Sequence, residues 1–425
     1  TSTGTSGGIY ATKSSGSISI ETGDITIGSS SLSSPSNGTS FGIYVDAPTS
    51  NTGSITTGNI YVNQTEGTGI YAKNINNITV GNILSGKNGV YQEANANGTL
   101  KTGLITLTGT ADDMLGIGVK GSPVAVDITG IKTSNISGTI TSAGNGLIGI
   151  YIPNGSLKVG SDGINIKGGD SSTGVYIKDP SLASGSVPTS IVDFGTASSS
   201  IDLGKESVGI FLEGQKVSNM MNGSIKVGDS GSTLSDMSTG IYTENVIFDN
   251  SITTNVETGK NAIGVYFGKD TKASSGNLIY NGNVKVGEGS TGVYKVGGTL
   301  ERSASSTMEI TGSSASSIGF YLDDSTLNLT GSLSTTTLKM DSGIAFLLKG
   351  NSSNVEYNGT IITETDLNSM TGLGADVERM VYSERNQLLT GDITLSSNVR
   401  TRGHRAINGR IDLDANIYTS STNPV

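Results

Sequence analysis

The stretch Ser172-Thr173-Gly174-Val175-Tyr176-Ile177-Lys178 carries the pattern that decides the fold of this chain. In an extended strand, Val175 and Ile177 fall on one face, whereas Gly174, Tyr176 and Lys178 fall on the other. We therefore expect a strand with an apolar inner face and a tyrosine-bearing outer face.

The Gly-Ile/Val-Tyr centre of this stretch recurs along the chain. The full triplet stands at 8–10, 42–44, 69–71, 89–91, 149–151, 174–176, 240–242, 264–266 and 292–294. Four variants of the triplet continue the same spacing, at 118–120, 209–211, 319–321 and 343–345. The mean spacing is about 28 residues, a period typical of solenoids and other repeat arrays.

A second phrase, Gly-x-Ile/Val/Leu-x-Ile/Val, lies between the triplets. It occurs at 23–28, 155–160, 223–228 and 282–287, where another glycine closes it. Alternation of β-branched and polar residues predicts a strand with one buried face, and the frequent Gly, Asn and Ser residues leave no room for ordinary helices. The chain is predicted to be a succession of short strands joined by turns.

Three architectures compete for such a chain. A disordered tract would not keep apolar residues in register, and an antiparallel sandwich does not need the same phrase at a fixed period. A parallel β-helix needs it, because each coil buries its apolar face only by stacking on the next. We predict an all-β, single-chain parallel β-helix of about fifteen coils over residues 1–425, with a possible irregular or helical insert at 365–390.

Composition narrows the functions open to the chain. It has 425 residues, 62 Gly, one His (His404), no Cys, no Trp and a net charge of −10. The acidic balance disfavours nucleic acid and anionic lipid as partners, and no apolar run is long enough to cross a membrane. The scarcity of acid-base and nucleophilic groups predicts a protein that is not an enzyme and carries no cofactor and no metal.

One stretch resembles a catalytic motif. The sequence Gly228-Asp229-Ser230-Gly231-Ser232 matches the nucleophile motif of chymotrypsin-like proteases, but His404 follows the serine instead of preceding it. Similar turns at 167–173 and 285–291 occupy the same place in the repeat. We therefore interpret this stretch as a turn of the repeat with no catalytic role.

The tyrosines of the triplets are predicted to line up from coil to coil on the outer surface. Such a ladder either stacks ring on ring for stability or provides an aromatic strip that binds glycans or another protein. The expected members are Tyr10, Tyr44, Tyr71, Tyr91, Tyr151, Tyr176, Tyr242, Tyr266, Tyr294 and Tyr321; Tyr176 and the last four are candidate binding residues.

A second candidate is a basic cluster near the end of the chain. In an otherwise acidic sequence, a local basic cluster consists of Arg400, Arg402, His404, Arg405 and Arg410, of which Arg400, Arg402 and Arg405 are candidate binding residues. Such a run is either a solvated loop or a patch that recognises an acidic ligand.

Through its Gly-Ile/Val-Tyr triplets and Gly-x-Ile-x-Val-Gly phrases, nearly the whole chain resembles the passenger repeats of large bacterial autotransporters, particularly fusobacterial adhesins. The resemblance implies a right-handed β-helix displayed outside the outer membrane, not inserted in it, that attaches to host-cell proteins or glycans or to other bacteria. We expect a monomeric, non-catalytic adhesin segment. The alternatives are a glycan-active β-helix enzyme, either a lyase or a hydrolase, and a purely structural stalk.

Overall fold

The computed structural model describes residues 6–28, 36–62, 64–133, 145–179, 187–233, 236–303, 306–311, 316–329, 336–340 and 344–349 and, beyond residue 350, strands between 354 and 419. Within these residues the chain is all-β, has no α-helix, and pairs its strands in parallel, which agrees with the predicted β-helix architecture. The chain divides into two compact units, Thr1–Asn222 and Gly223–Val425, where the sequence suggested a single segment.

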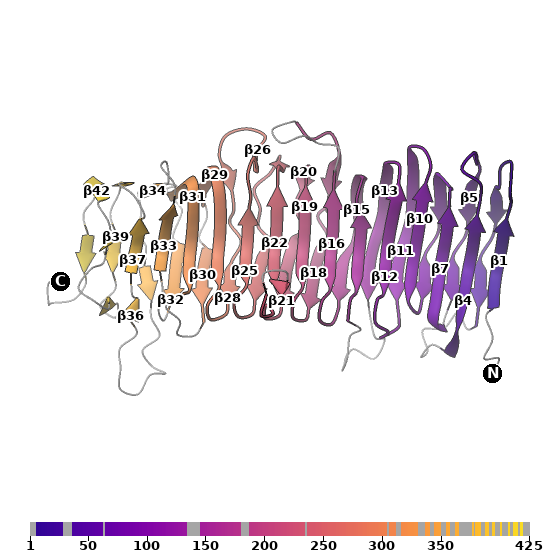
Figure 1. Cartoon of the computed structure of the whole chain (residues 1–425), viewed down its shortest axis with the longest axis horizontal. Coiled ribbons are helices and arrows are strands. Elements are labelled where there is room, and N and C mark those ends of the chain that lie inside the picture. The colour runs from indigo at the N-terminus through magenta and orange to yellow at the C-terminus, as the bar shows by residue number, and fades with distance from the viewer. Residues whose placement is uncertain are drawn as a thin grey trace. The chain divides into compact units, whose positions relative to one another are not determined.

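Unit 1 repeats a passage of strands over three faces, with consecutive passages stacked in chain order (Figure 1). The tyrosine-bearing face consists of β1 (Ser6–Thr12), β4 (Ser36–Asp46), β7 (Gln64–Lys73), β10 (Asn88–Ala94), β12 (Leu115–Gly121), β14 (Ile148–Ile152), β16 (Thr173–Lys178) and β19 (Val208–Glu213). The other faces contain β2 (Ile20–Thr22), β3 (Ile25–Ile27), β5 (Ser54–Thr57), β6 (Ile60–Val62), β8 (Asn77–Val80), β9 (Ile83–Ser85), β11 (Gly98–Leu107), β13 (Val124–Thr133), β15 (Gly155–Lys167), β17 (Ile191–Asp193), β18 (Ser198–Leu203) and β20 (Lys216–Asn219).

Unit 2 follows the same plan. Its tyrosine-bearing face contains β22 (Thr239–Glu244), β25 (Ile263–Phe267), β29 (Thr291–Glu301), β31 (Ile318–Leu329), β33 (Ile344–Lys349), β37 (Arg379–Ser383) and β41 (Ile407–Asn408). Beside them run β21 (Asn222–Val227), β24 (Asn255–Thr258), β28 (Val284–Val286), β30 (Ser306–Ile310), β32 (Thr336–Met340), β35 (Ile362–Glu364), β39 (Ile393–Leu395) and β43 (Ile417–Thr419). The remaining strands are β23 (Ile247–Phe248), β26 (Lys272–Ala273), β27 (Leu278–Ile279), β34 (Asn354–Tyr357), β36 (Asp376–Val377), β38 (Gln387–Thr390), β40 (Arg400–Thr401) and β42 (Ile411–Asp414).

The interior stack predicted from the triplets is confirmed within each unit. Val175 is fully buried and lies in register between Ile150 and Ile210, each one repeat away. The same register joins Ile9, Ile43, Ile70 and Val90 in unit 1 and Ile241, Val265 and Val293 in unit 2. Because each apolar side chain packs on its counterpart in the next repeat, no repeat can bury its core alone.

Two of the variant triplets are corrected by the strand register. Tyr91 is opposite Gly118, so the in-step triplet is 116–118 and not 118–120. Phe320 is opposite Phe346, so the last triplet is 345–347 and not 343–345. In both places a second glycine or a shifted apolar residue imitates the motif, and only pairing with the neighbouring strand decides the register.

The glycine of the triplet has a steric role that alternation does not predict. Gly174 is buried together with Val175, although strict alternation placed it on the outer face. A Cβ on Gly174 would lie 2.5 Å from the carbonyl oxygen of Gly209 and 2.9 Å from Cγ2 of Ile201. Glycine is needed here because the backbones of neighbouring repeats approach too closely for a side chain.

Short polar side chains tie one repeat to the next at the turns. Asp24 Oδ1 accepts the backbone N–H of Asn59 at 2.7 Å, and Asn59 Oδ1 accepts the N–H of Asn82 at 2.8 Å. Asn82 Oδ1 continues the series by accepting the N–H of Leu104 at 2.8 Å. These bonds satisfy backbone donors at positions where the sheet ladder is interrupted.

The predicted insert at 365–390 contains three described segments, the strands β36, β37 and β38. β37 and β38 pair in parallel with β33 and β34. The rest of that range, and the loops at 29–35 and 180–186, lie outside the described residues.

Candidate functional site

The tyrosines of unit 1 form the ladder that the sequence predicted. Tyr10 and Tyr44 stack at a centroid distance of 4.8 Å, Tyr44 and Tyr71 at 4.9 Å, and Tyr71 and Tyr91 at 5.1 Å, with interplanar angles of 8° to 11°. A second run joins Tyr151, Tyr176 and Phe211 at 5.1 and 4.7 Å. The spacing follows from the strand separation of about 4.8 Å in a parallel sheet.

Gly118 separates these two runs, since it occupies the tyrosine position of its repeat. The side chain of Leu115 covers it, because a Cβ built on Gly118 would lie 2.7 Å from Cδ2 of Leu115. The gap between Tyr91 and Tyr151 is therefore filled from within the chain.

The ladder of unit 2 is less regular. Tyr242 and Tyr266 stack at 4.7 Å and 10°, whereas Tyr266 and Tyr294 meet edge to face at 75° and 5.1 Å. Tyr294 and Tyr321 lie 4.2 Å apart at 31°, and the Tyr294 hydroxyl donates to Asp323 at 3.4 Å. Four of the five predicted binding tyrosines thus form one row in unit 2, and Tyr176 lies in unit 1.

Except for Tyr10, which is exposed, the rings of the ladder are half-buried, so they present only part of themselves to solvent. In the stacked pairs each covered face lies against the next ring, so the ring edges are the part of the rings that can reach solvent. Burial raises the pKa of Tyr91, Tyr176 and Tyr266 above the ordinary tyrosine value. At neutral pH these three hydroxyls are therefore uncharged.

Outward charges alternate in sign from repeat to repeat, and the sequence analysis missed this signal. On the tyrosine-bearing face of unit 1, strand register aligns Asp46, Lys73, Glu93 and Lys120. On a neighbouring face it aligns Lys101, Asp127, Lys158 and Asp193. The signal is readable as the residue that follows the first inward apolar residue of each strand. It is Lys158 or Lys285 in the Gly-x-Ile/Val/Leu-x-Ile/Val phrases, and Asp127 or Glu257 in the strands that pair with them.

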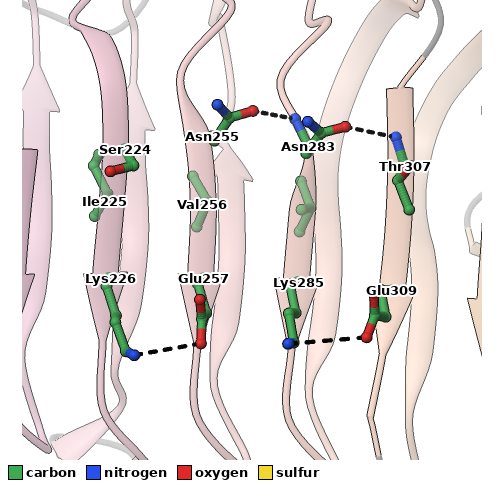
Figure 2. Close-up of a pocket in the computed structure, with 11 residues that line it drawn as sticks. Ser224, Ile225, Lys226, Asn255, Val256, Glu257, Asn283, Lys285, Thr307 and Glu309 are labelled. Atoms are coloured by element: carbon green, nitrogen blue, oxygen red, sulfur yellow. Dashed lines mark hydrogen bonds and ion pairs between the residues drawn. The ribbon is translucent and has the colours of Figure 1, made fainter. Parts of the chain in front are cut away.

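A further alternating row lies in unit 2 and borders a groove of about 500 Å³ on β21, β24, β28 and β30 (Figure 2). One wall is the alternating row Lys226, Glu257, Lys285 and Glu309, with Nζ to Oε1 distances of 3.6 Å for the first pair and 4.0 Å for the second. The opposite wall consists of Ser224, Asn255, Asn283 and Thr307.

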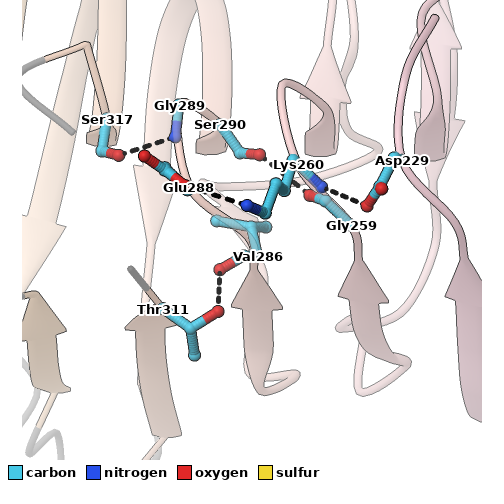
Figure 3. A network of polar contacts seen from close by, with 9 residues as sticks. All are labelled: Asp229, Gly259, Lys260, Val286, Glu288, Gly289, Ser290, Thr311 and Ser317. Carbon is cyan, nitrogen blue, oxygen red and sulfur yellow. Dashed lines mark hydrogen bonds and ion pairs between the residues drawn. The ribbon is translucent and has the colours of Figure 1, made fainter. Parts of the chain in front are cut away.

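A polar network adjoins this groove at the ends of the same strands (Figure 3). Lys260 donates its backbone N–H to Asp229 Oδ1 at 2.8 Å, and its Nζ lies 3.0 Å from Glu288 Oε2. The protease-like stretch belongs to this turn, where Ser230 Oγ accepts the backbone N–H of Ser238 at 2.8 Å. These bonds give Asp229 and Ser230 structural roles in the turn, as the repeat comparison predicted.

Two cations inside unit 2 also escaped the sequence analysis. Burial lowers the pKa of Lys295 to about 8 and that of Arg302 to about 10. Arg302 donates to the Gly282 carbonyl at 2.9 Å and lies 5.5 Å from the Tyr280 ring centroid. Both cations have internal acceptors, so we assign them to the interior of the fold.

The predicted basic cluster is only partly described. Arg400 begins β40 and stands opposite Asp376 in strand register, whereas Arg402 and Arg405 lie outside the described residues. The cluster therefore stays a prediction.

No protein-family model, no curated protein sequence and no solved structure matches this chain. Among the described residues, no group of three or more His, Cys, Asp or Glu side chains is placed to hold a metal ion. In the same part of the chain, no helix combines the length and apolar character needed to cross a membrane.

Proposed function

We propose that this chain is a non-catalytic attachment segment, a right-handed parallel β-helix of about fifteen coils displayed on a bacterial surface. Its partner is a surface protein or glycan of a host cell or of another bacterium. The observation that carries the proposal is the tyrosine ladder: a row of half-exposed rings whose hydroxyls recur at the spacing of the repeats.

Tyrosine suits such a role for physical reasons. It has few rotatable bonds, and in the ladder each ring is already held by its neighbours, so little conformational entropy is lost on binding. A row of weak, identical contacts also gains strength when many copies act together on one cell surface. A protein surface rich in backbone carbonyls can accept hydrogen bonds from the exposed hydroxyls.

A structural stalk is the competing function, and the ring geometry gives it specific support. In the stacked pairs the aromatic faces are buried against one another, so the rings stabilise the sheet whether or not they contact a partner. The two functions differ in what the hydroxyl groups do.

Replacing Tyr242, Tyr266 and Tyr294 together by phenylalanine separates the two functions. Phenylalanine keeps the rings and removes the hydroxyls, so we expect the melting temperature to fall only slightly, through the lost hydrogen bond from Tyr294 to Asp323, while attachment of the purified chain to cells falls about tenfold. The corresponding triple serine variant should lose both attachment and stability. Attachment retained by the phenylalanine variant, with a stability loss in the serine variant alone, would favour the stalk.

A further inference from the structure

The groove in unit 2 lies on a different face from the tyrosine ladder and has two walls of contrasting chemistry. Lys226, Glu257 and Lys285 are exposed on one wall, and Asn255 and Asn283 are exposed on the other. Between the walls the strands turn Ile225, Val256 and Val284 inward, so the backbone is the floor (Figure 2). The result is a straight channel that runs across the strands from repeat to repeat.

The charged wall has a period of two repeats. Like charges such as Lys226 and Lys285 stand two strands apart, which corresponds to about 9.6 Å at the usual strand separation. Strand register extends the alternation to Lys339 and Glu364. A linear ligand that complements this wall must therefore carry an anion at every second unit, with a hydrogen-bond donor at the units between.

The polar wall repeats at every strand. Asn255 Oδ1 accepts the backbone N–H of Asn283 at 2.9 Å, and Asn283 Oδ1 accepts that of Thr307 at 2.8 Å. Because both amide oxygens are occupied in this way, each Nδ2 group lies on the opposite side of its amide, toward the preceding strand, and can donate to a ligand (Figure 2). This wall therefore offers neutral donors at the spacing of single repeats.

We propose that this groove binds a linear, unsulfated acidic polysaccharide in which hexuronate and N-acetylhexosamine alternate. In an extended, equatorially linked polysaccharide, each sugar ring advances along the polymer by nearly the distance between two neighbouring strands of a sheet. Successive carboxylates then meet Lys226 and Lys285, and the acetamido N–H groups between them meet Glu257 and Glu309. The hydroxyls on the other edge of the sugars accept hydrogen bonds from Asn255 and Asn283.

The alternation also defines what the groove rejects. A sulfate on the hexosamine would lie against Glu257 or Glu309, so sulfated polymers should bind more weakly despite their greater charge. An extended acidic peptide advances by about 3.3 Å per residue and loses register with the lysines. This order of preference is the reverse of that expected for a general basic patch.

The test uses the full chain and hyaluronan tetrasaccharides and hexasaccharides as probes, with binding measured by calorimetry at low salt. We expect Lys226→Ala combined with Lys285→Ala to raise the Kd about tenfold, since two charge-assisted contacts are lost. Asn283→Asp should also weaken binding without unfolding, because it keeps the acceptor for Thr307 and replaces the Nδ2 donor with a charged oxygen.

The matched control is Lys101→Ala combined with Lys158→Ala in unit 1. These lysines are exposed and belong to an equivalent alternating row, but the positions two residues before its acidic members are Ala125 and Ile191, which cannot donate from a side chain. The control should bind hyaluronan like the parent chain.

An equal loss in the control, tighter binding of heparin than of hyaluronan, or equal binding of poly-glutamate would overturn the inference. Its outcome is also separable from the attachment role. A chain that attaches to cells but does not bind hyaluronan contradicts only the groove, and one that binds hyaluronan but does not attach contradicts only the attachment role.

Discussion

Lys295 is buried at a position that the repeat normally gives to an apolar side chain. It lies in register with Phe267 and Leu322, and only 1% of its surface is exposed. Its Nζ donates to the carbonyls of Thr271 and Val296 at 3.1 and 2.8 Å. Burial lowers its pKa to about 8, while Glu244 and Asp270 act in the opposite direction. The charged form of Lys295 therefore costs unit 2 stability at neutral pH.

The pH dependence of unfolding measures this cost. Between the folded pKa of about 8 and the ordinary value of 10.5, the unfolded chain binds more protons than the folded chain, so stability should rise with pH across this window. We expect a gain of about 2 kcal/mol between about pH 7 and pH 9.5. In Lys295→Met this gain should disappear.

Urea unfolding of both proteins at the two pH values provides the measurement. The difference between parent and variant cancels the contributions of other titrating groups. An identical pH dependence in the two proteins would mean that Lys295 does not titrate inside the fold.

At the scale of the element, alternation and periodicity predicted the strands, their inward faces and the tyrosine ladder. They worked because parallel stacking repeats one environment, so a residue such as Val175 needs the same chemistry as Ile150 and Ile210. The register at 116–118 could not be predicted, because two glycines fit the motif and only the neighbouring strand distinguishes them.

The groove and the buried cations escaped prediction for a different reason. The opposite charges of Glu257 and Lys285 become significant only when their strands are aligned, and the two residues become neighbours only when those strands pair. Lys295 follows the tyrosine of its triplet as Ile177 does, a place that alternation assigns to the inner face, but a charged side chain there contradicts the apolar pattern that was used to identify the core.

The alternating charges in unit 2 also favour the pairing of each strand with the next repeat in the chain. Because the repeats are alike, a strand could pair with the repeat after next, which would place Lys226 beside Lys285. Alternation makes that pairing a contact of like charges, so the correct order is favoured. Each exposed pair contributes only about 0–1 kcal/mol, and the effect therefore depends on the whole row.

Reversing one charge tests this role of the row. Glu257→Lys would place a third positive charge between Lys226 and Lys285, and we expect a loss of roughly 0.5–1 kcal/mol at low salt. Glu257→Gln removes the attraction without adding repulsion and should lose less. Urea unfolding at low and high salt measures both, and the difference should shrink at high salt because exposed charges are screened. A difference that does not change with salt would contradict an electrostatic role.

At the scale of the whole molecule, the stack of repeats makes stability a sum of contacts between neighbours. Between β1 and β19, each strand of the tyrosine-bearing face in unit 1 pairs with the preceding and following repeats, as β16 pairs with β14 and β19. A change in one repeat reaches a distant repeat only through each interface between them. The destabilisation caused by a substitution should therefore decrease with distance along the unit.

Val175→Asp tests this transmission. Val175 is fully buried, so an aspartate there would place an unpaired charge in the core and should cost on the order of 3–5 kcal/mol. Hydrogen exchange should show the greatest loss of protection in β14, β16 and β19, and progressively smaller losses toward β7 and β4. Lys178→Ala is the matched control on the same strand: it removes the 2.9 Å ion pair with Glu213 at the surface and should cost less than about 1 kcal/mol. A uniform loss of protection from β4 to β19 would show instead that unit 1 unfolds as a single block, because a chain of neighbour contacts cannot carry a local defect undiminished to its far end.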